Sequence, residues 1–182
     1  GNGGTAIYSD GGTITLNTGS SITTGQNDGV GVYAVNQTGT VVNNSTLSVG
    51  DGSYGFVFTG ATTPSFTNNQ SATIGNNSIF VFADSTLTAD NSGTLTMTGS
   101  DNVGFYMAQD PASGAGGAVM TNNGTISGTA GNNNVGIYNY GGTVDNYGTV
   151  SVGNSDILFV SGTTDVDVEN SKYSVGIYGE NA

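Results

Sequence analysis

Three carboxylates at alternating positions form the pattern with the most obvious catalytic chemistry. Asp165, Asp167 and Glu169 alternate with Val166 and Val168, so on a β-strand they would share one face, about 7 Å apart. Polysaccharide hydrolases use two carboxylates about 5–9 Å apart, and clustered carboxylates also suit a weak Ca²⁺ site. A solvated strand face shows the same alternation without any chemical role. We favour the solvated face.

The composition argues against most other chemistry. The chain has 182 residues, with 13 Asp or Glu, a single Lys or Arg, no His and no Cys, and a formal net charge of -12. Nucleic-acid binding needs several cations to neutralise phosphates, and Lys172 stands alone. Without His or Cys, Ser–His–Asp triads, thiol nucleophiles and ordinary zinc sites are excluded. We expect no enzymatic activity, no metal and no cofactor. No apolar run is long enough to predict a membrane-spanning helix.

A repeated motif must position whatever function the chain has. Val-Gly-Ile-Tyr occurs at 135–138 and 175–178, with close relatives at 30–33 and 103–106. Weaker copies lie at 5–8, 54–57, 78–81 and 156–159. Successive copies are 19 to 32 residues apart, about 24 on average. A fixed period of this length is typical of solenoids, in which each unit buries its apolar face only against its neighbours.

Each unit has room for three short strands separated by polar turns. The 32 Gly and the many Asn, Ser and Thr disfavour helix, and alternating stretches such as Leu47-Ser48-Val49 favour strands. The pattern predicts an all-β parallel β-helix (solenoid) of about eight coils of roughly 24 residues, forming one segment over 1–182. We expect one inward row of large apolar side chains. It comprises Ile7, Val32, Phe56, Phe80, Phe105, Ile137, Leu158 and Ile177.

Asn-rich pairs recur after the second apolar position of each unit. Examples are Asn43-Asn44, Asn68-Asn69 and Asp90-Asn91. Asn tolerates left-handed backbone and suits a tight corner, and stacked Asn amides can bond from one coil to the next. We predict that these pairs are structural, and that the carboxylates of Asp90, Asp145 and Glu169 occupy the same column as the Asn residues.

The combination of these motifs resembles a known family. Val-Gly-Ile-Tyr, the Asn-rich corner and Gly-Thr-[Val/Ile]-Ser at 124–127 and 148–151 are similar to the passenger repeats of large autotransporter adhesins, of the fusobacterial type (type V secretion). The resemblance implies a right-handed β-helix that is displayed outside the bacterial cell. The passenger would be held at the outer membrane by a translocator beyond this chain. We therefore expect a segment of a longer protein.

Two features are candidate binding surfaces. The Tyr of the repeat should point outward, and this column comprises Tyr8, Tyr33, Tyr106, Tyr138 and Tyr178, with Phe159 in register. Such rings could bind a sugar or a protein, or could simply stack between coils. Tyr138, Tyr140 and Tyr147 form the densest aromatic group. The second candidate is an insertion at about 108–117, which includes Gln109, Asp110 and Pro111, because solenoid insertions often form recognition loops.

A column of hydroxyls offers a weaker alternative. Outward Ser and Thr recur once per unit at Thr23, Ser48, Thr73, Thr96, Ser127, Ser151 and Ser174. A Thr array could order water against ice, but Thr also suits any half-exposed strand.

The expected function is therefore non-enzymatic attachment to host cells or other bacteria, through a protein or glycan partner. A purely structural stalk is the first alternative, and a polysaccharide-active β-helix of the tailspike type is the second.

Overall fold

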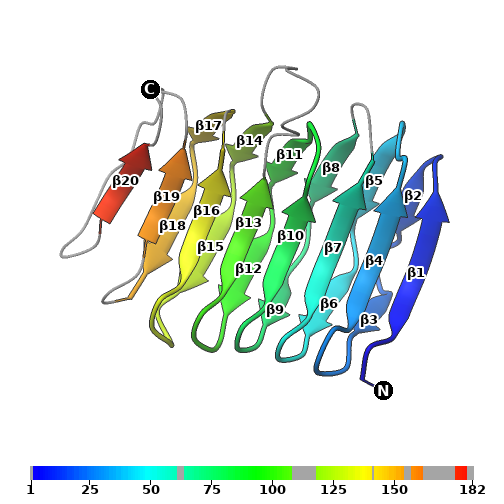
Figure 1. The fold of residues 1–182 in the computed structure, drawn as a ribbon, viewed down its shortest axis with the longest axis horizontal. Helices are drawn as coiled ribbons and strands as arrows, with labels where there is room; N and C mark the ends of the chain where they lie inside the picture. Colours follow the sequence, from blue (N-terminus) through cyan, green and yellow to red (C-terminus); the bar gives the residue numbers. More distant parts are fainter. Residues whose placement is uncertain are drawn as a thin grey trace.

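The chain folds into a parallel β-solenoid (Figure 1). The structure, a computed structural model, describes residues 2–60, 64–107, 118–140, 142–153, 157–161 and 175–179, with the last two ranges described only as backbone. Within these ranges the chain forms twenty strands in three parallel sheets and no helix. It follows that these ranges include no helix that could span a membrane.

Each sheet collects one strand from every turn of the solenoid. The eight-stranded sheet contains β1 (Thr5–Asp10), β4 (Val30–Val35), β7 (Tyr54–Thr59), β10 (Ile79–Ala83), β13 (Val103–Met107), β16 (Val135–Asn139), β19 (Ile157–Ser161) and β20 (Val175–Gly179). One six-stranded sheet contains β2 (Ile14–Leu16), β5 (Thr40–Asn43), β8 (Ser65–Asn68), β11 (Thr88–Asn91), β14 (Val119–Asn122) and β17 (Thr143–Asn146). The other contains β3 (Ser21–Thr23), β6 (Thr46–Val49), β9 (Ala72–Ile74), β12 (Thr94–Met97), β15 (Thr125–Gly128) and β18 (Thr149–Val152).

The predicted all-β parallel solenoid is confirmed, but the prediction of eight coils was too large. The structure shows about five turns: each turn leads from one set of three strands to the next, from β1–β3 at one end to β16–β18 at the other. Strands β19 and β20 extend only the eight-stranded sheet. The last two copies of the repeat therefore contribute one described strand each, and counting motifs overestimated the number of turns.

The interior is packed with aromatic and aliphatic side chains. Phe56, Phe66, Phe80 and Phe105 are at most 1% exposed, and their ring centroids lie 4.7 to 6.5 Å apart. Phe66 comes from a six-stranded sheet and the other three from the eight-stranded sheet. Side chains from different sheets therefore pack together in one core, which no single turn could bury by itself.

The register of the strands corrects two positions of the predicted inward row. Val81 pairs with Phe56, so Val81 rather than Phe80 occupies the predicted inward row, although both are fully buried. Phe159 pairs with Ile137, so the predicted place of Leu158 in that row was also wrong. Both strands are runs of consecutive apolar residues, in which a one-residue shift leaves the apolar pattern almost unchanged.

A ladder of Asn amides runs through one corner of the interior. Asn43, Asn68, Asn91 and Asn122 are fully buried. Each Nδ2 donates to the Oδ1 of the next residue, ending at Asn146, over 2.7 to 2.9 Å. The ladder confirms the prediction that stacked amides bond between coils. Buried amides that are paired in this way avoid the cost of unsatisfied polar groups.

The membership of the ladder differs from the prediction. Asp90 pairs with Thr67 and Thr121 on the opposite face of its strand, while Asn91 takes the ladder position. Asp145 likewise pairs with Thr121. A carboxylate cannot donate to the next amide, so the prediction that carboxylates share the ladder column was wrong for Asp90 and Asp145. The predicted Glu169 lies outside the described residues.

Left-handed backbone occurs at a different corner, in the turns before β4, β7, β10, β13 and β16. Asp28, Gly52, Asn77, Asp101 and Asn133 all have positive φ, between 51° and 63°. Only Gly, Asn and Asp adopt this conformation readily. The positive φ therefore explains why Gly, Asn and Asp occupy these turns. The Asn residues of the ladder do not have positive φ.

A second polar ladder starts the strands of the eight-stranded sheet. The backbone N–H groups of Gly29, Ser53, Ser78 and Asn102 donate to the side-chain oxygens of Ser53, Ser78, Asn102 and Asn134, respectively. These bonds measure 2.9 to 3.3 Å. They fix each strand start to the next coil. The signal in the sequence for this ladder is a Ser or Asn directly before the first strand of a unit.

Candidate functional site: the outer face of the eight-stranded sheet

The outer face of the eight-stranded sheet carries two rows of apolar side chains. One row follows the strand starts and comprises Thr5, Val30, Tyr54, Ile79, Val103 and Val135. The second row comprises Tyr8, Tyr33, Val57, Phe82, Tyr106 and Tyr138. Among the described side chains of these two rows, the polar groups are the hydroxyls of Thr5 and of the Tyr residues, and there is no charged group.

The second row is the predicted tyrosine column, with one correction. Tyr33, Tyr106 and Tyr138 are half-buried and Tyr8 is 62% exposed, so the column does point outward. The next register position after Tyr138 is held by Val160, followed by Tyr178. The prediction that Phe159 belongs to this column was therefore wrong, for the reason of register given above.

Three rings of this row stack along the solenoid. Phe82 lies parallel to Tyr106, with centroids 5.3 Å apart and an interplanar angle of 3°. Tyr106 in turn stacks on Tyr138 at 4.6 Å and 4°. At the other end of the row, Tyr8 and Tyr33 meet edge to face at 5.8 Å. Aromatic pairs of this kind stabilise by about 0.5–1.5 kcal/mol beyond their burial, which supports the interpretation that the rings hold neighbouring coils together.

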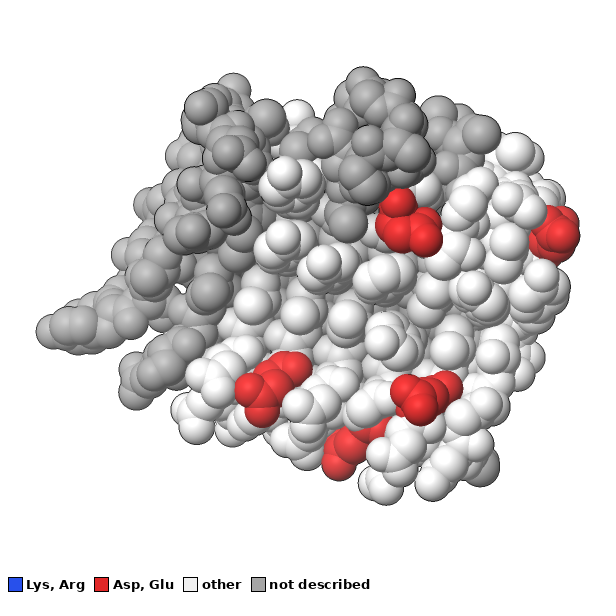
Figure 2. All heavy atoms as spheres, viewed as in Figure 1, with Lys and Arg blue, Asp and Glu red and all other residues white. Residues whose placement is uncertain are grey.

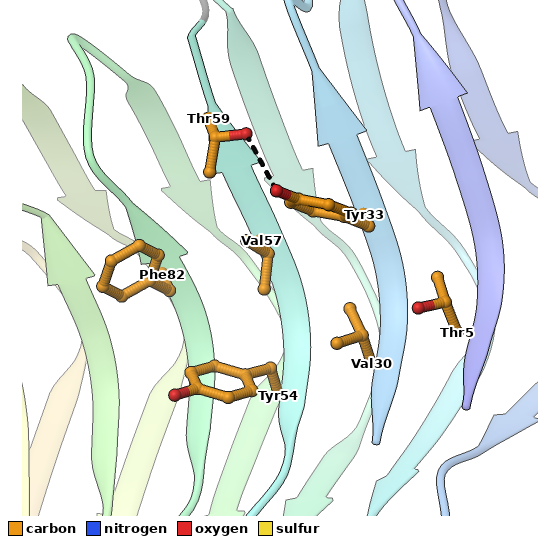
Figure 3. A pocket seen from close by; sticks show the side chains of 7 residues that line it. All are labelled: Thr5, Val30, Tyr33, Tyr54, Val57, Thr59 and Phe82. Atoms are coloured by element: carbon orange, nitrogen blue, oxygen red, sulfur yellow. Dashed lines mark hydrogen bonds between the residues drawn. The ribbon is translucent and has the colours of Figure 1, made fainter. Parts of the chain in front are cut away.

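The row is interrupted at Val57, which leaves a depression in the face (Figure 3). Val57 lies between Tyr33 and Phe82 and carries no ring. The depression has a volume of about 380 Å³. Its lining consists of Thr5, Val30, Tyr33, Tyr54, Val57, Thr59 and Phe82. The Thr59 hydroxyl donates to the Tyr33 hydroxyl oxygen over 3.4 Å, which places two oxygens at one side of a mostly apolar hollow.

Carboxylates flank this face at both ends of its strands. Asp28 and Asp51 lie in the turns before β4 and β7, while Asp10 ends β1 and Asp84 follows β10. Figure 2 shows that the acidic side chains coloured on this view lie towards its margins. The described residues include seven Asp and no Lys or Arg. The apolar face therefore lies in a negative field that no described cation neutralises.

The site residues predicted from the sequence are distributed over several parts of the fold. Tyr106 and Tyr138 are neighbours in the stack. Tyr140 follows β16 and is 40% exposed, whereas Tyr147 is 76% exposed in the turn between β17 and β18. Since that turn joins the two six-stranded sheets, Tyr147 does not lie on the same face as Tyr138.

The predicted insertion and the three alternating carboxylates lie outside the described residues. These comprise Gln109, Asp110 and Pro111 in the insertion, and Asp165, Asp167 and Glu169. Among the residues that the structure does describe, no three carboxylates come close enough together to hold a metal ion.

The predicted hydroxyl column is confirmed over its described members, while Ser174 lies outside the described residues, and a second hydroxyl column lies beside it. Register pairs connect Thr23, Ser48, Thr73, Thr96, Ser127 and Ser151 along the outer face of the sheet that contains β3. Thr94, Thr125 and Thr149 form a second column on the same face. Ser at 48, 127 and 151 lacks the γ-methyl of Thr, so the surface is not the uniform methyl and hydroxyl array that an ice plane would need. The columns fit an ordinary solvated sheet.

Sequence reasoning did not find the row of aliphatic residues or the depression. Val30, Val103 and Val135 stand at the first position of their motif copies, and Ile79 aligns with them by register; the recurrence of the three Val was a usable signal. The depression had none, because it depends on which residue faces Val57 from the neighbouring coils. Comparison with protein-family models, curated proteins and solved structures found no match for this chain.

Proposed function

We propose that this chain is a non-enzymatic segment of a bacterial surface adhesin, and that it binds through the outer face of the eight-stranded sheet. The observation that supports this most is the continuous aromatic and aliphatic surface of that face. Contiguous apolar surface on a folded protein is typical of interaction sites, and aromatic side chains are enriched among the residues that dominate binding energy.

The resemblance to autotransporter passengers supplies the cellular setting of the proposal. The segment would lie outside the cell, held at the outer membrane by a translocator beyond this chain, and would attach the bacterium to host cells or other bacteria. We also infer that the solenoid is right-handed, since parallel strands joined by crossovers are right-handed in nearly all cases. A stiff acidic rod would present its binding face away from the cell and resist bundling with its neighbours.

The proposal is tested by binding of the purified 182-residue chain to host cells, partner bacteria, proteins and glycans. Val103→Thr combined with Val135→Thr makes the face polar while it keeps β-branched side chains that suit strands. We expect at least a fivefold loss of saturable binding. The matched control is Thr94→Val with Thr125→Val, the opposite exchange on the hydroxyl face, which should leave binding unchanged.

The alternatives are separated by the same material. No saturable binding by a chain whose circular dichroism shows β-structure would favour the structural stalk. Binding that is unaffected by the two valine changes and lost on deletion of 109–117 would move recognition to the insertion. Glycan cleavage that disappears in Asp165→Asn or Asp167→Asn would favour the hydrolase.

A further inference from the structure

We propose that the depression over Val57 is a receptor for an arginine side chain of a partner protein. This inference rests on the proposed function, because it names the chemistry of the partner that the apolar face would bind. It is carried by three features of the described residues: a missing ring in the aromatic row, two hydroxyl oxygens beside the gap, and carboxylates that flank the gap on both sides.

The first feature fixes the shape of the occupant. Tyr33 and Phe82 stand two strands apart in one row with only Val57 between them, which corresponds to roughly 9–10 Å. Phe82 stacks on Tyr106, and Tyr54 packs edge to face against Phe82, with centroids 6.2 Å apart. The hollow over Val57 is therefore bordered by the rings of Tyr33, Tyr54 and Phe82. A thin, planar group suits a space that is bordered by rings.

The polar atoms fix the chemistry of that flat group. The hydroxyl oxygens of Tyr33 and Thr59 lie together at the gap, while the Tyr54 hydroxyl points away from this pair (Figure 3). The Tyr33 oxygen accepts from Thr59, and both oxygens keep a lone pair for a further donor. A guanidinium group is planar, donates in its own plane and stacks on aromatic faces. A phenyl ring would fill the same space but could not donate to the remaining lone pairs of these oxygens.

Charge distinguishes a basic partner from a glycan. Asp10 ends β1 and Asp84 follows β10, whereas Asp28 and Asp51 lie in the turns before β4 and β7. At about 3.3 Å per residue, the first two carboxylates are about 10 Å from mid-strand and the other two about 15–18 Å, compared with a screening length of about 8 Å at physiological salt. They attract a cationic segment that crosses the face and repel sialylated or sulfated sugars. Neutral sugars would need open ring faces, and in this row the faces between Phe82, Tyr106 and Tyr138 already cover one another.

The test compares two peptides of equal charge on the 182-residue chain, by calorimetry at 150 mM salt. Hexaarginine should bind at least fivefold more tightly than hexalysine, the difference expected for a partly exposed cation–π contact. Val57→Tyr restores the missing ring and should abolish this preference. Val42→Tyr adds the same ring on the outer face of β5 and should retain it. Phe82→Leu, which removes a ring face from the depression, should also lose the preference.

Each outcome decides the matter. Equal affinity for the two peptides, or a preference that survives Val57→Tyr, means that charge alone attracts the peptides and overturns the inference. Binding of a neutral hexasaccharide that Val57→Tyr abolishes would assign the depression to glycans and also overturn it. If cells bind the unmodified chain and the Val57→Tyr chain equally, the adhesin proposal stands and only the arginine receptor fails. If no cell or partner binds, the adhesin proposal fails, and the peptide result still decides whether the receptor exists.

Discussion

Replacing Asn91 by aspartate would put a carboxylate inside the buried amide ladder. The Asn91 Nδ2 donates to the Oδ1 of Asn122 at 2.8 Å, and the Asn91 Oδ1 accepts from Asn68 at 2.9 Å. Aspartate keeps the acceptor and the shape of the side chain but loses the donor. The Asn122 oxygen would then face a negative oxygen in the protein interior, where it now receives a hydrogen bond.

The size of the effect follows from these contacts. A buried acceptor left unpaired costs about 1–3 kcal/mol. Burial and the facing Asn122 oxygen raise the pKa of the new carboxyl group, and each unit of that rise costs about 1.4 kcal/mol when the group is ionised. The hydrogen bond from Asn68 to the carboxylate offsets part of this cost. We expect Asn91→Asp to lower the free energy of unfolding by about 2–4 kcal/mol at pH 7.

The loss should depend on pH in a defined direction. When the folded-state pKa of a carboxyl group lies above its unfolded value, the folded protein binds more protons between the two values, so the free energy of unfolding falls as pH rises through that window. At pH 4 the protonated carboxyl can again donate to Asn122. The variant should therefore lose only about 1 kcal/mol there, the cost of a less favourable neutral hydrogen bond.

Urea denaturation at pH 4 and pH 7 measures both values, followed by far-ultraviolet circular dichroism and by the fluorescence of the nine Tyr. The control is Asn69→Asp, which makes the same exchange at an exposed pair whose Nδ2 donates to Asn44 at 2.8 Å. Asn69→Asp should cost less than about 1 kcal/mol, as exposed polar contacts do, with little change between the two pH values. Equal losses in the two variants, or a pH-independent loss in Asn91→Asp, would refute a tightly paired ladder.

Two further predictions concern packing. Tyr106→Leu removes both stacking contacts of the central ring and should lower the free energy of unfolding by about 1–3 kcal/mol. The control Tyr8→Leu loses one edge contact at a 62% exposed ring and should cost under about 1 kcal/mol. Equal losses of the two variants in urea denaturation would contradict the ring stack. Gly55→Ala would place a Cβ 2.6 Å from the Phe80 carbonyl oxygen and 2.9 Å from a Leu47 methyl, so we expect the free energy of unfolding to fall by about 1–3 kcal/mol. The exposed exchange Ser48→Ala is the control. An unchanged stability of Gly55→Ala would show that neighbouring coils are not in such close contact.

The class of fold and the main structural columns could be predicted because they depend on local pattern. The repeat spacing, the alternation of apolar and polar residues and the abundance of turn residues all point to stacked strands. The hydroxyl column and the existence of an amide ladder followed from the same periodicity. Each of these features needs only that every unit repeats the one before it.

The predictions failed where the repeat is imperfect. In β10 and β19 the consecutive apolar residues match two registers, and only the interior contacts of neighbouring coils select one. At Asp90-Asn91 the choice of which residue faces inward depends on hydrogen bonds to Asn68 and Asn122, some 23 and 31 residues away.

The sequence by itself therefore determined the architecture of this protein. Its periodic apolar pattern can be buried only when the units stack. Because the chain is acidic and rich in Gly and Asn, the units can stack only as strands joined by tight turns. Tertiary structure decided the surface. Whether Val57 is an unremarkable valine or the floor of a depression depends on the rings that the coils on either side place next to it, because side-chain neighbours in a solenoid come from adjacent turns rather than from adjacent positions in the chain.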